Sequence, residues 1–212
     1  DEIAVIIVGT KRVYMLIYVF SCAFTISSPP KVNAIFTGAN TVYEPEIHTH
    51  LNVAAIAFTN LYDGAAGTSN ALTTMKNSFS GFGHTDADLH HALLGDSLGG
   101  GIAYVGVLCR QDVGFGLSAS MIGSYSSMDA ATVWDMKVFT HELGHNFGSG
   151  HTHDSNYYNP VIDTCGVDPY GFCGTSTPWT CASSCPAMVD DSATIMSYCH
   201  QCSAGYNSVD YT

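Results

Sequence analysis

The sequence predicts an α+β fold in two parts, an upper subdomain over residues 1–148 and a lower subdomain over residues 149–212. Three observations lead to this prediction. Short apolar runs alternate with segments of helical period along the first part of the chain. A longer helical segment with a His-rich end comes after them. After residue 151 the composition shifts to Asn, Pro, Gly, Ser, Thr and Cys with little periodicity, which is typical of a small irregular subdomain.

The composition excludes several classes of partner. Only 11% of the residues are charged, and 18 acidic against 6 basic residues give a net charge of -12, which argues against nucleic acid and anionic membranes. The apolar run that follows the first basic pair covers ~14 residues, too few to span a bilayer, so we expect no membrane insertion. With so few charges, the surface relies on Ser, Thr, Asn and Gly, or is partly covered by flanking domains of a longer chain or by a larger assembly.

The N-terminal residues predict a strand and two helices. Residues 2–9 are a β-branched run closed by Gly, which predicts a buried strand. Residues 13–26 predict a buried helix, which we prefer to a signal peptide because a strand precedes it and no small-residue cleavage pattern is evident. Residues 31–43 have a helical period and predict the second helix.

The middle of the chain continues the alternation. Residues 51–58 predict a strand, and residues 70–79 predict a helix. Residues 84–91 are rich in His and Asp, and their plainer interpretation is a helix start with Asp86 as its cap. The alternative, a second metal site, is weaker because no spacing there fits a known mechanism. Residues 99–109 predict a Gly-flanked strand that ends in Cys.

The helix predicted over residues 129–147 contains the residues that indicate chemistry. His141 and His145 lie one turn apart on the same face of a helix, so both imidazoles can reach one metal ion. Glu142 sits beside the first of them, where a carboxylate can take a proton from a metal-bound water. A catalytic zinc has three protein ligands and leaves a fourth position for water. The two His residues therefore account for two of the three protein ligands of a catalytic zinc site, and a third must come from elsewhere in the chain.

The residues after this helix supply the third ligand. Gly148 can adopt a positive φ, which ends the helix and turns the chain back, so that His151 can complete the site. Two His residues at helical spacing also arise by chance on a surface or in a structural site. The longer pattern with Gly148 and His151 is much more specific.

The extended motif, HELGHNFGSGH, resembles the metzincin signature, and TIMSY around Met196 resembles the Met-turn of that clan. With IAYVGVLC, PVIDTCG and TIMSYCHQC, residues 31–202 are similar to a metalloprotease catalytic domain of the adamalysin/reprolysin type. The resemblance implies an α/β/α-type zincin fold. That fold has a mostly parallel twisted sheet with an antiparallel edge strand, a long active-site helix and a small irregular C-terminal subdomain.

The same resemblance implies a secreted, extracellular zinc-dependent endopeptidase that acts on proteins or peptides. It implies Zn²⁺ as the cofactor, with water activated by Glu142, and a metal site formed by His141, His145 and His151. The substrate is expected to lie extended along the edge strand and to pair with it through main-chain hydrogen bonds. The residues implied for this pairing are Ile102, Ala103, Tyr104 and Val105.

The chain departs from the family pattern after its third His. Adamalysins place Asp directly after that residue, whereas Thr152 and His153 here precede Asp154. Tyr198, two residues beyond Met196, has the spacing of the tyrosine ligand of astacins and serralysins. Three roles are therefore open for it: a fifth zinc ligand, a hydrogen-bond donor to the developing oxyanion, and a packing residue of the lower subdomain.

Eight Cys residues favour disulfide bonds and an oxidising compartment. A zinc-Cys cluster is the alternative, because Cys181 with Cys185 and Cys199 with Cys202 have tolerable ligand spacing. Disulfides are favoured over it, because the His motif already implies a secreted zinc enzyme and small secreted domains use such bonds. The resemblance implies at least three disulfides, one of them joining Cys109 to Cys199 or Cys202.

A rival interpretation belongs to another functional class. The chain could be a non-proteolytic structural or binding module that zinc stabilises within a larger extracellular assembly. The low charge content favours it. Glu142 counts against it, because a purely structural zinc site needs no general base next to a ligand.

Overall fold

The structure is a computed structural model, and it describes residues 11–20, 29–59, 64–78, 87–110, 112–123, 134–163 and 193–201. The strand predicted over residues 2–9 lies outside them, as do all cysteines except Cys109 and Cys199. The chain forms two compact units. The first comprises Asp1–Met128, Trp134–Gly148 and Thr212, and the second comprises Asp129–Val133 and Ser149–Tyr211.

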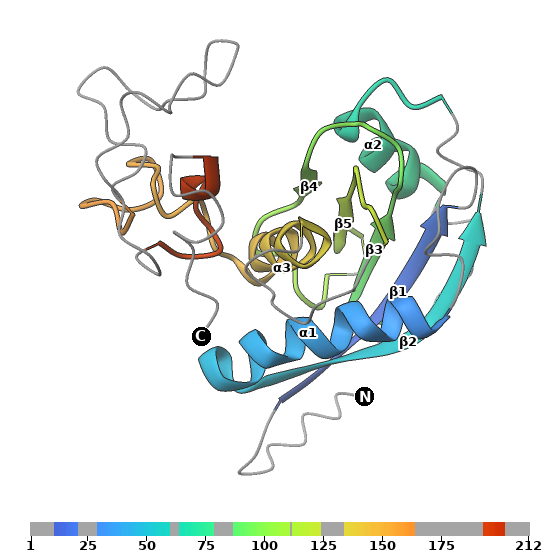
Figure 1. Cartoon of the computed structure of the whole chain (residues 1–212), viewed down its shortest axis with the longest axis horizontal. Coiled ribbons are helices and arrows are strands. Elements are labelled where there is room, and N and C mark those ends of the chain that lie inside the picture. The colour runs from blue at the N-terminus through green and yellow to red at the C-terminus, as the bar shows by residue number, and fades with distance from the viewer. Residues whose placement is uncertain are drawn as a thin grey trace. The chain divides into compact units, whose positions relative to one another are not determined.

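A sheet of five strands organises the first unit (Figure 1), and its strand order is β2-β1-β3-β5-β4. The described elements are, in chain order, β1 (Lys11–Phe20), α1 (Pro29–Ile47), β2 (Thr49–Thr59), α2 (Thr68–Ser78), β3 (Leu89–Leu93), β4 (Gly101–Ala103), β5 (Phe115–Ser118), α3 (Trp134–Phe147) and the short 3-10 helix η4 (Cys199–Gln201). Neighbouring strands are parallel from β2 to β5, and only β4 runs antiparallel, at the edge beside β5. This architecture confirms the predicted α+β, zincin-type fold.

The predicted second helix, the strand over 51–58 and the helix over 70–79 are confirmed. They correspond to α1, β2 and α2, each of which begins slightly before the predicted start. The long helix is confirmed as α3 in its described part, from Trp134 onward.

The helix predicted over residues 13–26 is wrong, because residues 11–20 form strand β1. Val13, Met15 and Ile17 are buried, whereas Arg12 and Tyr14, which alternate with the first two of them, are exposed, and this is the two-residue period of a strand. β1 lies between two parallel neighbours. A parallel strand is commonly covered on both faces, so its sequence is nearly continuously apolar and cannot be told from a buried helix by periodicity.

The helix start predicted over residues 84–91 is also wrong, because Leu89 to Leu93 form strand β3 and all five are buried. Asp86 lies outside the described residues. Asp88, just before the strand, accepts a hydrogen bond from the Tyr14 N–H at 2.8 Å, which joins β3 to the start of β1. The strand was not recognised from the sequence because two adjacent His residues interrupt its apolar run.

The sheet has helices on both faces. Phe115 and Leu117 of β5 belong to a buried cluster with Leu72 and Met75 of α2. Gly116, between them on β5, points the other way, because a Cβ built on it would lie 3.0 Å from Oδ1 of Asn146 on α3. Helices α2 and α3 therefore cover opposite faces.

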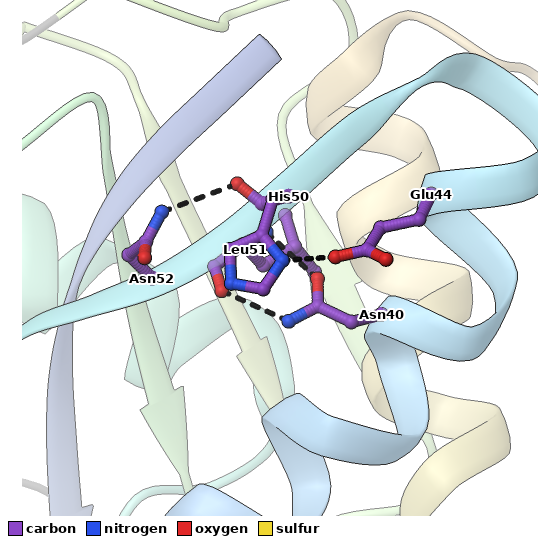
Figure 2. A network of polar contacts seen from close by, with 5 residues as sticks. All are labelled: Asn40, Glu44, His50, Leu51 and Asn52. Carbon is purple, nitrogen blue, oxygen red and sulfur yellow. Dashed lines mark hydrogen bonds and ion pairs between the residues drawn. The ribbon is translucent and has the colours of Figure 1, made fainter. Parts of the chain in front are cut away.

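Helix α1 lies on the α3 side of the sheet, where the rings of Phe36 and Phe139 pack with their centroids 5.2 Å apart. A short turn joins α1 to β2, and Figure 2 shows the contacts that hold it. The Asn40 amide donates to the Leu51 carbonyl at 3.0 Å and accepts from the Leu51 N–H at 2.7 Å, and Glu44 pairs with His50. These contacts fix the start of β2 against the helix.

The second unit is irregular in its described residues. Thr152 is its centre: its N–H donates to the Met196 carbonyl at 3.3 Å, and its carbonyl accepts from Ile162 and Asp163. The Asp163 carboxylate in turn accepts from the N–H and the hydroxyl of Thr194, at 3.1 and 2.7 Å. Side chains thus satisfy backbone groups that no helix or sheet pairs.

The described cysteines behave differently from each other. Cys199 is fully buried and disulfide-bonded. Cys109 is exposed, and its Sγ donates to Oδ1 of Asp88 at 3.6 Å, which does not support the disulfide expected from this residue. The predicted number of disulfides stays a prediction. Among the described residues, no helix is long and apolar enough to cross a bilayer.

Candidate metal centre

Helix α3 is almost entirely buried, from Asp135 to Asn146. At its N-terminal end the Asp135 carboxylate accepts hydrogen bonds from the N–H groups of Ile122 and Gly123, at 2.7 and 2.6 Å. An acidic side chain there also interacts favourably with the helix dipole. The helix is therefore anchored to the segment that follows β5.

The C-terminal end of α3 is closed as predicted. Gly148 has a φ of 110°, a conformation that favours glycine, and its N–H donates to the His145 carbonyl at 2.9 Å. The same carbonyl accepts from the Gly106 N–H at 2.9 Å, and the Asn146 carbonyl accepts from Val107 at 2.9 Å. The loop after β4 thus supplies donors for the last carbonyls of the helix.

Three imidazoles gather at this end. His141 and His145 lie one turn apart with ring centroids 4.8 Å apart. With His151 they form a group that could hold a metal ion, because one ligand nitrogen from each lies within 4.8 Å of the others. Two nitrogens on one tetrahedral zinc lie roughly 3.3 Å apart, given Zn–N bonds of about 2.0–2.1 Å. Small side-chain rotations therefore suffice, and three imidazoles are a donor set that suits zinc.

Glu142 is buried against the edge strand, with 5% of its surface exposed. A Cβ built on Gly101 of β4 would lie 2.7 Å from both Cδ and Oε1 of Glu142. Burial raises the pKa of Glu142 to about 8, and the opposing effect of Lys137 is smaller. Burial lowers the pKa of Lys137 to about 7, with Glu142 acting in the opposite direction. A buried carboxyl group thus lies one residue from His141.

Tyr43 of α1 makes a hydrogen bond to helix α3. Its hydroxyl donates to the Thr140 carbonyl at 2.9 Å, and its pKa is raised, first by burial and then by the charge of Glu142. The tyrosine is therefore neutral and acts as a hydrogen-bond donor to α3.

The predicted substrate-binding residues lie at or just beyond the edge strand. Ile102 and Ala103 belong to β4, whereas Tyr104 and Val105 follow its end. The Tyr104 N–H donates to the Phe115 carbonyl at 3.2 Å, and its carbonyl accepts from the Asn146 amide at 2.9 Å. Both backbone groups of Tyr104 are thus used inside the unit, whereas the Val105 side chain is exposed.

The segment around Met196 forms a turn, in which the Ser197 N–H donates to the Thr194 carbonyl at 3.1 Å. Tyr198 follows it, with its ring centroid 4.5 Å from that of His151. Its N–H donates to Nδ1 of His153 at 3.2 Å. The His153 ring stacks on His151 at 5.2 Å. Tyr198 and His153 therefore both contact the third His of the motif.

The alternative metal site around residues 84–91 finds no support in the described residues, where the one three-ligand group is that of His141, His145 and His151. His90 packs on Phe115, on the α2 side of the sheet. His91 faces α3 and bonds Ser118 Oγ at 2.9 Å. Burial lowers the pKa of His90 to about 4 and that of His91 to about 3, so both are neutral core residues.

Sequence reasoning missed three residues around this centre. Asn146, Gly101 and His153 attracted no prediction of function. The position of Asn146 directly after the second His was a usable signal, because a buried amide at a helix end needs partners. The roles of Gly101 and His153 depend on contacts with residues distant in the chain or on ring packing, for which spacing gives no signal.

The family model that matches the chain is described as Metallo-peptidase family M12B Reprolysin-like, and it matches residues 30–152, more than half of the chain. No curated protein matches. Among solved structures, 90 chains match. One, from a structure of a chaperone-substrate complex, has a TM-score of 0.52 and 14% identity, and the match covers 70% of this chain and 25% of that one. This chain thus spans a quarter of that chain's length, and the likeness shows the fold alone.

Proposed function

The chain belongs to the reprolysin-like metallopeptidases of family M12B, which are zinc enzymes, and from that membership we propose that it is a secreted zinc-dependent endopeptidase. The observation on which the proposal rests is the group of three imidazoles beside a buried carboxylate and an edge strand. Its substrate class is proteins or peptides.

His141, His145 and His151 are the proposed zinc ligands. Their chemistry and spacing support this assignment, because neutral imidazoles are common zinc ligands and a catalytic site uses three protein ligands. When bound, zinc supplies a Lewis acid that lowers the pKa of water and polarises a peptide carbonyl. The role of the chain is to hold the three rings, two through the helix and one through the turn at Gly148.

Glu142 is the proposed general base. When the neighbouring His141 holds zinc, the pKa of Glu142 is lowered and its carboxyl group stays ionised, because a nearby positive charge favours the carboxylate. Glu142 then accepts a proton from the water that attacks the scissile carbonyl and returns it to the leaving amine. Its position next to His141 and its burial against β4 support this role. A structural metal site would not require a buried carboxylate in that place.

Strand β4 is the proposed seat of the substrate backbone. The Gly100 carbonyl and the Tyr104 N–H both bond β5-side partners, Ala119 and Phe115. Because backbone groups alternate in direction along a strand, the N–H and C=O groups of Gly101 and Ala103 face away from β5. An extended peptide can pair with them. Ile102, Tyr104 and Val105 then contribute position and side-chain contacts.

Tyr198 is proposed to act on the His151 side of the centre, as a fifth ligand or as a donor to the developing oxyanion. The 4.5 Å separation of its ring from that of His151 supports this role. The turn at Met196 sets its position in the chain. The same proposal includes two subdomains, over residues 1–148 and 149–212. It also includes disulfide bonds that stabilise the second subdomain.

The decisive experiment compares the wild-type chain with Glu142→Ala, using a quenched fluorescent peptide library with and without a zinc chelator. Chelation should abolish cleavage, and Glu142→Ala should retain about one zinc per chain but lose roughly 10²–10⁴ in rate. Zinc binding without any cleavage by the wild type would instead favour the zinc-stabilised structural module. Near-normal turnover by Glu142→Ala would refute the role assigned to that residue.

A further inference from the structure

The glycine at the start of the edge strand has no backbone reason to be glycine. Gly101 does not have a φ in the left-handed region, whereas Gly99, two residues earlier, has a φ of 99°. Any residue could therefore adopt its backbone conformation. The reason for the absence of a side chain must be sought in what surrounds the position.

Those surroundings are the Glu142 side chain. A Cβ on Gly101 would meet Cγ of Glu142, and would lie 2.7 Å from both Cδ and Oε1. Ordinary contacts between a Cβ and a heavy atom begin near 3.4 Å. The carboxylate therefore lies directly on the α-carbon of the strand.

The neighbouring Gly100 differs in this respect. A Cβ there would meet only Cη2 of Trp134, at an ordinary 3.8 Å, and this residue also has no positive φ. The same glycine-to-alanine change is thus tolerated by the geometry at position 100 and not at position 101. This pair of adjacent residues separates a steric effect on Glu142 from a general effect on the strand.

We propose that Gly101 is a positioning residue for Glu142: the missing side chain makes room for the carboxylate on the backbone of the edge strand. This inference rests on the proposed function. It also adds a physical link, because the residue whose peptide groups face an incoming substrate is the residue on which the general base rests. The distance between the base and the substrate backbone is then fixed by one α-carbon.

An alanine at position 101 displaces the carboxylate rather than unfolding the chain. The three nearest atoms are Cγ, Cδ and Oε1 of one side chain and include no backbone atom, so rotation of the Glu142 side chain relieves the clash. A misplacement of a reacting group by about 1 Å can lower a rate on the order of 10²-fold. The three atoms nearest to the new methyl group all belong to Glu142 and none to the three His residues, so metal binding should persist.

The test is a double-mutant cycle with Gly101→Ala, Glu142→Ala and the double variant, with Gly100→Ala as the matched control. Zinc content, kcat, KM and the urea midpoint of unfolding are measured for each. Gly101→Ala should keep about one zinc and lose at least tenfold in kcat with KM changed less than threefold, while Gly100→Ala stays within twofold of wild type. In the Glu142→Ala background, Gly101→Ala should change neither the residual rate nor the midpoint.

When all the variants fold, three outcomes overturn the proposal. They are a kcat for Gly101→Ala within twofold of Gly100→Ala, loss of zinc in Gly101→Ala, and an equal drop in midpoint whether or not Glu142 is present. If Gly101→Ala fails to fold, the double variant with Glu142→Ala must still fold, because it lacks the side chain that the new methyl group meets. Failure of the double variant to fold also overturns the proposal. Absence of cleavage by the wild type refutes the proposed function instead, and the midpoints then still decide whether Gly101 and Glu142 are coupled.

Discussion

Replacing Asn146 with Ala should be the most destabilising single change around the metal centre. Its side chain is fully buried at the end of α3. The amide donates to the Tyr104 carbonyl at 2.9 Å and to the Phe115 carbonyl at 3.0 Å, and so joins the helix to β5 and to the residue that follows β4. Alanine removes both bonds and leaves a space that the surrounding strands fill only in part.

The size of the loss depends on the partners that each carbonyl keeps. The Phe115 carbonyl still accepts from the Tyr104 N–H, whereas the Tyr104 carbonyl loses the donor on α3. A buried group that loses its partner costs about 1–3 kcal/mol, and the weakened second bond adds about 1 kcal/mol. We therefore expect a loss of about 2–4 kcal/mol in the free energy of unfolding. For a chain of this size that corresponds to a fall of roughly 4–16 °C in Tm.

Urea unfolding at saturating zinc measures this loss, and Asn40→Ala is the matched control. Asn40 also makes two bonds to backbone groups, both of Leu51, but it is only half-buried, so water can replace its amide. Its loss should be about 0.5–1.5 kcal/mol. A loss for Asn146→Ala no larger than that for Asn40→Ala would refute the reasoning.

Three further changes have definite expected outcomes. Burial lowers the pKa of His91 to about 3, so between pH 6.5 and about 3 the unfolded state binds a proton that the folded state does not. As the pH is lowered through this range, the free energy of unfolding should decrease by about 1.4 kcal/mol per pH unit for this group. Urea titrations of His91→Leu should show a shallower dependence of the free energy of unfolding on pH, and a dependence identical to that of the wild type contradicts this. Tyr198→Phe should reduce kcat with little change in KM if its hydroxyl acts in the transition state, and unchanged kinetics leave it a packing role. Gly148→Ala forces a side chain into a φ of 110° and should weaken zinc binding by shifting His151, which a competitive chelator titration detects; unaltered affinity would show that the turn tolerates the strain.

The sequence was sufficient for the elements whose pattern is local. Helix α2 and strand β2 follow from periodicity, and the ligand motif is readable because all its members lie within one helix and one turn. Strands β1 and β3 were mistaken for helices, because the sequence of β1 is a nearly continuous apolar run and β3, with all five residues buried, lacks the alternation that identifies a strand. Strand β5, with glycines next to its Phe and Leu, attracted no prediction at all.

The fine structure of the candidate site could not be read in this way. Gly101 meets Glu142, and Asn146 meets Tyr104, only because β4 packs on α3. Nothing in the spacing of these residues reports that packing. The stacking of His153 on His151 likewise depends on the path of the chain after the helix.

The loop after β4 has a second constraint, because it donates hydrogen bonds to the end of a helix. Val105 and Gly106 are exposed, and exposed loops are where a chain ordinarily accepts an inserted tag, a protease nick or a new terminus. Here the N–H groups of Gly106 and Val107 are bonded to the His145 and Asn146 carbonyls. An epitope inserted at this point would withdraw those donors and free the end of α3 that presents two imidazoles. For protein engineers, this visible surface loop is therefore as intolerant of insertion as the interior of a helix.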